Sequence, residues 1–281
     1  MKYVSFEHGG APSWGIAAGA GIIDPGRRVR AIFPDLRSYI AAGFPCADEY
    51  AGASPAFAWD EIVLSPVVPN PAMIIMAAIN YFEEEAKPAS GPEYPVLFLR
   101  LPSSQIGHGA PLIRPRESHK LDFEGELAVI IGKPGRHIPR AQAMSHVAGY
   151  ACYNDGSVRD WQKHSHQFTP GKNFVGTGAF GPWMVTADEL PDPKGLSLVT
   201  RVNGIEMQRT DTSRMIFDVS YLISYISTFT PLAPGDVIVT GTCGGFGSTR
   251  KPPQFLSAGD VVEVEIEGVG LLSNPVIDEV A

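Results

Sequence analysis

The chain has 281 residues, of which 44% are hydrophobic and 19% are charged, and its 30 acidic against 22 basic residues give a net charge of −8. This apolar fraction excludes a disordered chain, and a chain of this length buries enough surface to fold without crosslinks. The acidic balance argues against nucleic-acid binding, which usually requires a basic surface.

Cysteine usage and the lack of long apolar runs favour a cytoplasmic protein without membrane spans. The three cysteines, Cys46, Cys152 and Cys243, are widely spaced, so they form neither a disulfide framework nor a CxxC zinc motif. The first residues lack the apolar core of a signal peptide. The most apolar stretch, residues 72–79, is too short to cross a bilayer. We therefore expect neither a membrane nor a nucleic acid as a partner.

The first part of the chain differs in texture from the rest. Residues 1–66 carry few charges and many small side chains, and a loop rich in proline begins at Ser65-Pro66. Abundant glycine and proline throughout the chain suit many short strands joined by turns. We predict a small N-terminal domain over residues 1–66 and a main body over residues 67–281.

The main body is predicted to be rich in strands. Apolar or β-branched runs that are typical of strands occupy residues 73–77, 96–100, 127–131, 237–240 and 261–266. Two segments predict helices: residues 139–147, which begin at a proline, and residues 212–228, which carry apolar residues at helical spacing. Because strands outnumber helices, the expected fold class is a β-rich α+β body.

An acidic cluster lies just before the third of these strands. Asp122, Glu124 and Glu126 are two residues apart, so in a strand they would share one face at intervals of about 7 Å. Like charges at this spacing repel unless a cation or water separates them. The cluster is therefore either a solvated acidic edge or a divalent-metal site, for which oxygen ligands favour Mg²⁺, Mn²⁺ or Ca²⁺ over zinc. Asp155, after a short apolar run, is the best candidate for a further ligand.

An ordered series of segments over residues 70–275 resembles the fumarylacetoacetate hydrolase family. The series comprises Asn80-Tyr81, PVLFLRLPSSQIGHGAPLIRP (95–115), LDFEGELAVIIG (121–132), GYACYNDGSVRDWQ (149–162), PGKNF (170–174), GPW (181–183), VNGIEMQ (202–208), PGDVIVTGT (234–242) and FLSAGDVVEVEIEGVG (255–270). This resemblance implies a mixed β-roll catalytic body behind the small N-terminal domain. It also implies a metal at the open end of the roll and a homodimer.

The resemblance assigns the metal ligands. They would be Glu124, Glu126 and Asp155, holding Mg²⁺ or Mn²⁺, with Ca²⁺ as an alternative, and Asp122 would support them. Lys172 matches the family lysine that helps to polarise the substrate and support the metal ligands, although without the resemblance it would be read as a surface lysine.

The resemblance also implies a set of substrate-binding residues. These are Tyr81, Arg100, Arg159, Gln162 and Thr242. Arg159 and Gln162 fit a D-x-x-x-R-x-x-Q pattern that lines the pocket, although an ion pair of Arg159 with Asp160 is an alternative. Thr242 ends a TGT turn that resembles a carboxylate-binding turn, but an ordinary strand-ending turn would look the same. Arg100 replaces a family lysine and is either a bidentate carboxylate ligand or a surface charge.

The chain departs from the family pattern at the expected base. Family hydrolases read N-Y-x-x-H-x-x-E, with the His and the Glu on a mobile lid, whereas NYFEEEAK places Glu84 and Lys87 at those two positions. Three interpretations follow. Glu84 is itself the base, with a pKa raised by its acidic neighbours and by burial; or the reaction needs no attacking water; or the segment is only an acidic lid.

The leading hypothesis is a divalent-metal-dependent hydrolase that cleaves a C–C bond in a 2,4-dioxo acid such as an acylpyruvate, as in the catabolism of aromatic compounds. The metal would stabilise the enolate that forms, a base would activate water and Lys172 would add positive charge. The alternatives are a 2-oxo acid decarboxylase or tautomerase, and a non-catalytic relative that binds a 2-oxo acid. In each case the expected partner is a small 2-oxo acid.

Overall fold

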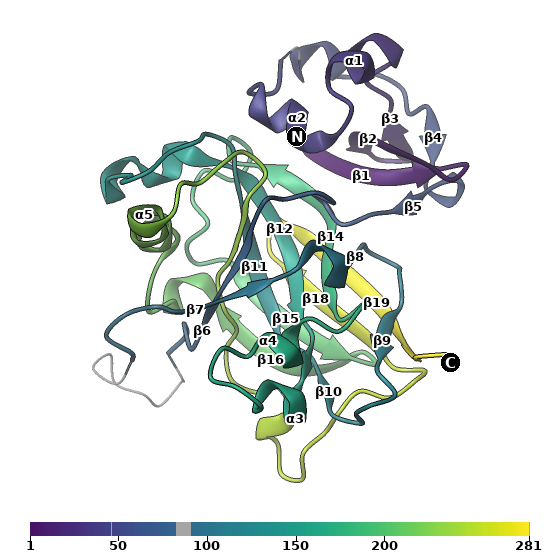
Figure 1. Cartoon of the computed structure of the whole chain (residues 1–281). Coiled ribbons are helices and arrows are strands. Elements are labelled where there is room, and N and C mark those ends of the chain that lie inside the picture. The colour runs from purple at the N-terminus through teal and green to yellow at the C-terminus, as the bar shows by residue number, and fades with distance from the viewer. Residues whose placement is uncertain (46, 83–90, 281) are drawn as a thin grey trace.

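The computed structural model describes residues 1–45, 47–82 and 91–280, in which strands hold far more residues than helices do (Figure 1). The strands are β1 (Lys2–His8), β2 (Ala11–Ala18), β3 (Gly21–Ile23), β4 (Phe57–Ala58), β5 (Val63–Leu64), β6 (Ile74–Ala78), β7 (Val96–Arg100), β8 (Gln105–Ile106), β9 (Leu112–Arg114), β10 (Leu121–Asp122), β11 (Gly125–Ile131), β12 (Val147–Asp155), β13 (Ser157–Val158), β14 (Gly178–Thr186), β15 (Ser197–Val202), β16 (Ile205–Asp211), β17 (Val237–Val239), β18 (Val261–Ile266) and β19 (Gly270–Asp278). The predicted β-rich α+β class is confirmed.

Helices are few and short. The α-helices are α1 (Arg27–Ile32), α2 (Leu36–Ala41), α3 (Arg159–Gln162), α4 (Thr169–Lys172) and α5 (Val219–Phe229), and the 3₁₀ turns are η1 (Ala47–Tyr50), η2 (Trp59–Glu61), η4 (Pro102–Ser104), η5 (Arg140–His146), η6 (Thr212–Arg214) and η7 (Gly247–Thr249). No helix in the described ranges is long and apolar enough to span a membrane.

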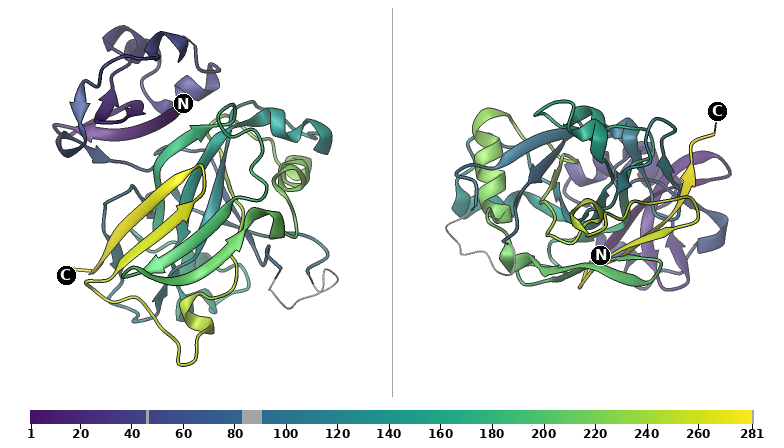
Figure 2. Two further views of the ribbon diagram at one scale, coloured as in Figure 1. Left: turned by 180° about the vertical axis from the view of Figure 1, so that it is seen from behind. Right: turned by 90° about the horizontal axis from the view of Figure 1, so that it is seen from below.

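Two sheets form the body of the protein. The larger has the strand order β4-β3-β2-β1-β14-β12-β11-β17-β6-β7, with β5 and β8 paired to β1 and β14, and the smaller has the order β16-β15-β18-β19-β9. The smaller sheet covers one face of the larger, as the view from behind shows (Figure 2). A short third pair, β10 with β13, lies near the site described below.

Strand β11 lies in the middle of the larger sheet and has both faces covered. All seven of its residues are buried. Leu127 and Val129 belong to the core between the two sheets, whereas Ala128 and Ile130 belong to a second core on the opposite face. An unbroken apolar run is expected for a strand that is buried on both faces, so this segment shows no alternation of apolar and polar residues.

The N-terminal region forms a lobe at one end of the molecule (Figure 1). Its first strand pairs with β14, where Tyr3 lies opposite Met184. Trp14 belongs to the same hydrophobic core as residues of β6 and β11. The lobe therefore continues the main sheet, and the division into residues 1–66 and residues 67–281 stays a prediction.

The predicted strands correspond to β6, β7, β11, β17 and β18, but the predicted helices differ in detail. The segment predicted at residues 212–228 is a 3₁₀ turn followed by α5, because Asp218 begins a new helix as its N-cap by accepting a hydrogen bond from the Tyr221 amide at 2.8 Å. The segment predicted at residues 139–147 is the 3₁₀ turn η5.

Candidate metal centre and active-site cavity

A cavity of about 300 Å³ brings the predicted site residues together. It is lined by Ala77, Ala78, Ile79, Tyr81, Phe98, Glu124, Glu126, Asp155, Arg159, Gln162, Phe168, Lys172, Thr242, Cys243 and Phe246. Every predicted site residue except Arg100 and Glu84 is among them. Glu84 lies outside the described residues.

Antiparallel pairing of β11 with β12 positions the three candidate metal ligands. Glu126 lies at the start of β11, opposite Tyr153, and the Asp155 amide at the end of β12 donates a hydrogen bond to the Glu124 carbonyl at 2.8 Å. Carboxylate oxygens of Glu124, Glu126 and Asp155 lie within 4.8 Å of one another, and all three side chains are buried. Such a buried set of oxygen donors fits a hard divalent cation.

The chain leading into β11 is not the continuous strand that was predicted. Strand β10 ends at Asp122 and β11 begins at Gly125. The Asp122 carboxylate is directed away from the triad, where it accepts hydrogen bonds from the Gly247 and Ser248 amides at 2.7 and 2.9 Å. It also accepts one from Arg159 at 2.7 Å. Asp122 therefore anchors a loop and an arginine, in keeping with the supporting role that was expected.

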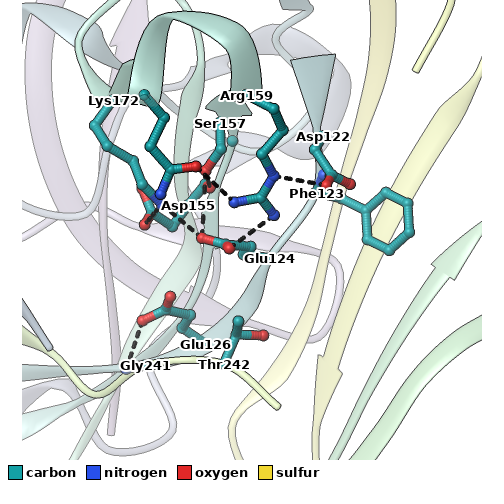
Figure 3. A network of polar contacts seen from close by, with 12 residues as sticks. Asp122, Phe123, Glu124, Glu126, Asp155, Ser157, Arg159, Lys172, Gly241 and Thr242 are labelled. Atoms are coloured by element: carbon teal, nitrogen blue, oxygen red, sulfur yellow. Dashed lines mark hydrogen bonds and ion pairs between the residues drawn. The ribbon is translucent and has the colours of Figure 1, made fainter. Parts of the chain in front are cut away.

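Lys172 is buried rather than on the surface. Its ammonium group lies 2.6 Å from Glu124 Oε2 and 2.5 Å from Asp155 Oδ2 (Figure 3). The same group lies 5.0 Å from the centre of the Phe98 ring, a distance at which a cation is attracted to the ring face. Helix α4 ends at Lys172 and so brings a positive charge into contact with two of the three carboxylates.

The acids of the triad differ in their pKa values. Although burial acts to raise it, the positive charges of Arg159 and Lys172 lower the pKa of Glu124 to about 2. Burial, together with the negative charges of Asp155 and Glu124, raises the pKa of Glu126 well above its ordinary value. The hydrogen bond that the Gly241 amide donates to the Glu126 carboxylate, at 2.6 Å, opposes this rise in pKa. An uncompensated negative charge at Glu126 is the electrostatic condition that a bound cation would relieve.

Arg159 links several of the predicted residues. Its guanidinium group contacts Asp122 at 2.7 Å and Glu124 at 2.8 Å, and it donates a hydrogen bond to Gln162 Oε1 at 3.0 Å. It also lies over the Phe246 ring. Among the described residues, the ion-pair partners of Arg159 are thus Asp122 and Glu124, and not Asp160, which was the alternative. Arg159 and Gln162 thus form one wall of the cavity beside Glu124.

Arg100 lies behind Asp155 and does not line the cavity. Its side chain is fully buried, pairs with Asp155 Oδ1 at 2.5 Å and donates hydrogen bonds to the Gly156 carbonyl and the Thr177 hydroxyl at 3.1 and 2.7 Å. This location excludes the surface-charge alternative and favours a role in holding Asp155. Substrate binding by Arg100 stays a prediction, and its place outside the cavity lining argues against it.

The TGT turn is joined to the triad through a residue to which no role was assigned from the sequence. Gln208 accepts a hydrogen bond from the Gly125 amide at 3.0 Å, and its amide nitrogen donates to Thr242 Oγ1 and the Cys243 carbonyl at 2.8 and 2.9 Å. The Thr242 hydroxyl donates to the Gly125 carbonyl at 2.8 Å. The sequence feature that could have pointed to Gln208 is its position at the end of VNGIEMQ, one of the segments that resemble the family.

The turn itself requires glycine at Gly241. Its φ is +94°, and a Cβ atom there would lie 2.8 Å from the Ala77 carbonyl oxygen and 2.9 Å from the Asn80 Cβ. Both the dihedral angle and the close approach exclude larger residues. The Gly241 amide can therefore reach Glu126, at the edge of the cavity.

Comparisons with known proteins agree with this geometry. Residues 74–277 match the family model described as fumarylacetoacetate (FAA) hydrolase C-terminal. The chain is 43% identical over 220 residues to the Xenopus laevis protein named oxaloacetate tautomerase fahd2, mitochondrial, covering 76% of this chain and 68% of the relative.

Solved structures share the whole fold. A fumarylacetoacetate hydrolase from Exiguobacterium antarcticum superposes with a TM-score of 0.88 at 35% identity, covering 99% of this chain and 100% of the other. A maleylpyruvate hydrolase from Sphingobium sp. SYK-6, in complex with manganese (II) ion and pyruvate, superposes with a TM-score of 0.82 at 26% identity, with 100% of both chains covered. The buried triad and this manganese-bound relative together support divalent-metal binding.

Proposed function

The chain belongs to the fumarylacetoacetate hydrolase family, and from this premise we propose that it is a divalent-metal-dependent tautomerase of 2-oxo acids. The observation that carries the proposal is the buried triad with the Lys172 ammonium group against Glu124 and Asp155. Among the described residues that line the cavity, none is a histidine. Enolisation needs a proton carrier and charge stabilisation, whereas hydrolysis also needs a base that activates water.

Glu124, Glu126 and Asp155 would hold the cation, for which we propose Mg²⁺ or Mn²⁺, with Ca²⁺ as an alternative. When bound there, such a cation supplies Lewis-acid polarisation of the 2-oxo acid. The three side chains are buried, so charge that develops on the substrate interacts with the site more strongly than it would in water.

The surrounding residues would bind the substrate and move its proton. We assign to Lys172 Nζ the transfer of a proton to or from C3 of the 2-oxo acid, because this group lines the cavity and lies against two of the carboxylates. Arg159 and Gln162 would orient the substrate from one wall, and Tyr81 and Thr242, which also line the cavity, would contribute to binding. In the tautomerisation, one proton leaves C3 and one joins the enol oxygen, or the reverse, so no co-reactant is consumed.

Spectroscopic and product analysis tests the proposal. We expect metal-dependent acceleration of the conversion of enol-oxaloacetate to the keto form, with the carbon skeleton intact by NMR. The Xenopus relative, which is named an oxaloacetate tautomerase, supports this choice of substrate. Accumulation of pyruvate and CO₂ above the rate with the metal alone would instead identify a decarboxylase, and inertness toward every 2-oxo acid tested would reject the proposal.

Hydrolysis of a C–C bond in an acylpyruvate is the second candidate. Solved relatives named fumarylacetoacetate hydrolase and maleylpyruvate hydrolase support it. In this reaction Glu84 is the candidate base. Incubation with acetylpyruvate distinguishes the two candidates, because hydrolysis releases pyruvate and acetate whereas tautomerisation releases neither.

Compartment and assembly are also proposals. The sequence favours the cytoplasm, although the Xenopus relative is named as mitochondrial. We propose a homodimer, with a small 2-oxo acid as the ligand, and sedimentation-velocity analysis tests the dimer directly.

A further inference from the structure

We propose that Ile79 is a specificity-determining residue that selects 2-oxo acids whose distal end carries no charge. This inference rests on the proposed function, because it concerns the part of the substrate that extends beyond the metal-chelating end. It differs from what the name of the Xenopus relative indicates, since oxaloacetate ends in a second carboxylate.

Ile79 combines features that are unfavourable for an isoleucine without a ligand. It is 63% exposed although it is a large apolar residue, and it lines the cavity. Its φ is +54°, a region that β-branched residues rarely adopt. Strained residues of this kind persist where the surrounding structure holds them, and they are concentrated at ligand sites. The strained backbone thus carries an apolar side chain that lines the cavity and is also largely exposed.

The next residue holds this conformation. The Asn80 side chain is fully buried and donates hydrogen bonds to the Thr240 and Phe217 carbonyls at 2.7 and 3.0 Å, while it accepts one from the Phe217 amide at 2.8 Å. The Asn80 carbonyl also accepts from the Ile216 amide at 2.8 Å. These bonds tie the backbone next to Ile79 to the TGT turn, so Ile79 has a fixed place relative to the substrate-binding turn.

A second strained residue lines the same cavity. Phe168 has a φ of +62° and packs edge-on against Phe98, with ring centres 5.8 Å apart. Ala77, Ala78 and Phe246 also contribute to the lining. The lining of the cavity therefore includes two alanines, one isoleucine and three phenylalanines beside its charged and polar residues, and these apolar side chains suit an alkyl or aryl group.

The charges of the site favour a substrate with one negative charge. Asp122 and the three triad acids face three buried cations, Arg100, Arg159 and Lys172, and each of these cations is already in an ion pair. With all four of these carboxyl groups ionised, as a bound cation would require, these seven described residues carry one net negative charge, which the divalent cation would convert to one net positive charge. The single carboxylate of a 2-oxo acid balances that charge, whereas a second carboxylate would leave the occupied site with one net negative charge.

Acetylpyruvate and oxaloacetate form a matched pair of substrates. They have the same carbon skeleton up to C4, where one carries a methyl group and the other a charged oxygen. For the wild-type protein with Mg²⁺, we expect kcat/KM for loss of the enol form to be at least tenfold higher with acetylpyruvate than with oxaloacetate. NMR detects any cleavage of the substrate, and cleavage is counted as turnover. Calorimetry gives a second readout that depends on binding alone. It compares 5-methyl-2-oxohexanoate, which ends in an isopropyl group, with 2-oxoglutarate, which ends in a carboxylate.

Substitutions then test the residue. Ile79→Lys should shift two ratios toward the dicarboxylate by at least tenfold: the ratio of kcat/KM for acetylpyruvate to that for oxaloacetate, and the ratio of the affinities for 5-methyl-2-oxohexanoate and 2-oxoglutarate. Ile79→Gly, which suits the positive φ, should lower the preference for the substrate with the apolar tail. Ile79→Val should leave the preference within twofold. The matched control is Ile205→Lys, because Ile205 is an isoleucine of similar exposure, 67%, that does not line the cavity.

The outcomes separate this inference from the proposed function. If wild-type protein prefers oxaloacetate, or if Ile79→Lys changes both substrates equally, Ile79 does not set specificity and the inference is overturned while the enzyme assignment stands. If neither substrate binds nor reacts, the proposed function itself fails. A ratio shift in Ile205→Lys equal to that in Ile79→Lys would show a general charge effect and would also overturn the inference.

Discussion

Replacement of Glu126 by glutamine should separate metal binding from folding. The side chain is buried, its carboxylate lies with those of Glu124 and Asp155, and its hydrogen bond from the Gly241 amide can be made equally well by an amide oxygen. Glu126→Gln therefore removes a charge without a change in shape. We expect loss of metal-dependent turnover together with retention of the fold.

The size of the effect follows from linkage between binding and folding. A cation at a concentration 100 times its Kd stabilises the folded state by about 2.7 kcal/mol. For a chain of 281 residues, that corresponds to a rise in Tm of about 5 °C. We expect this rise with Mn²⁺ or Mg²⁺ in the wild-type protein and a rise of less than about 2 °C in Glu126→Gln, measured by differential scanning fluorimetry at matched metal concentrations.

When a chelator removes the metal, Glu126→Gln should stabilise the folded protein at neutral pH, whereas with metal present it removes a stabilising effect. The pKa of Glu126 is raised in the folded state, mainly by burial and then by Asp155 and Glu124. The folded form therefore binds a proton more tightly than the unfolded form, so stability falls as pH rises from the ordinary glutamate pKa through the raised value. Glu126→Gln should abolish this fall. Glu124 acts in a different window, because its pKa of about 2 makes its contribution disappear only as pH falls below 4.5.

The control for this experiment is Glu7→Gln, since Glu7 is an exposed glutamate on β1 in the N-terminal lobe. It should leave both the metal-induced rise in Tm and the pH dependence unchanged. A full metal-induced rise in Glu126→Gln, or full activity of that variant, would refute the assignment of Glu126 as a ligand.

The remaining predictions concern the groups around the triad. Lys172→Met should lower kcat at least a hundredfold while calorimetry shows unchanged or tighter metal binding, because the ammonium group contacts Asp155 in competition with a cation; weaker metal binding would contradict this. Arg100→Met should destabilise the protein by about 3–5 kcal/mol in urea, since it breaks a buried ion pair, whereas Arg114→Met, at a pair with an exposed partner, should cost less than about 1 kcal/mol. Glu84→Gln should lower kcat strongly without a change in metal affinity if Glu84 is the base, and an unchanged kcat would place the base elsewhere.

The fold and the acidic cluster could be predicted because they depend on local sequence. A strand buried on both faces requires an unbroken apolar run, and residues 127–131 provide one. Glu124 and Glu126 could be placed together by their spacing alone. Asp155 followed from its position after an apolar run, and the pairing of β11 with β12 explains why it meets the two glutamates.

The functions of the arginines could not be predicted from their sequence neighbours. Arg100 follows an apolar strand and looks like a charge at a strand end, yet its partners Asp155 and Thr177 come from two distant segments. Asp122 fits the same alternation as the two glutamates, but the break between β10 and β11 turns its carboxylate toward the Gly247 and Ser248 amides. In both cases long-range contacts, which no local pattern encodes, decide the role of the side chain.

The arrangement of cations implies a division of tasks within the site. Arg100 and Arg159 each use several donors on fixed partners, including Asp155 and Asp122, so their positions are determined by the fold. Within the described part of the chain, Lys172 has only carboxylate oxygens as hydrogen-bond partners, and the Phe98 ring lies beside it. If those oxygens held a divalent cation, Lys172 would lose its ion-pair partners, and the Phe98 ring would still attract its ammonium group. The arginines therefore hold the triad in place, while the lysine is the cation that can respond to the metal and to the substrate.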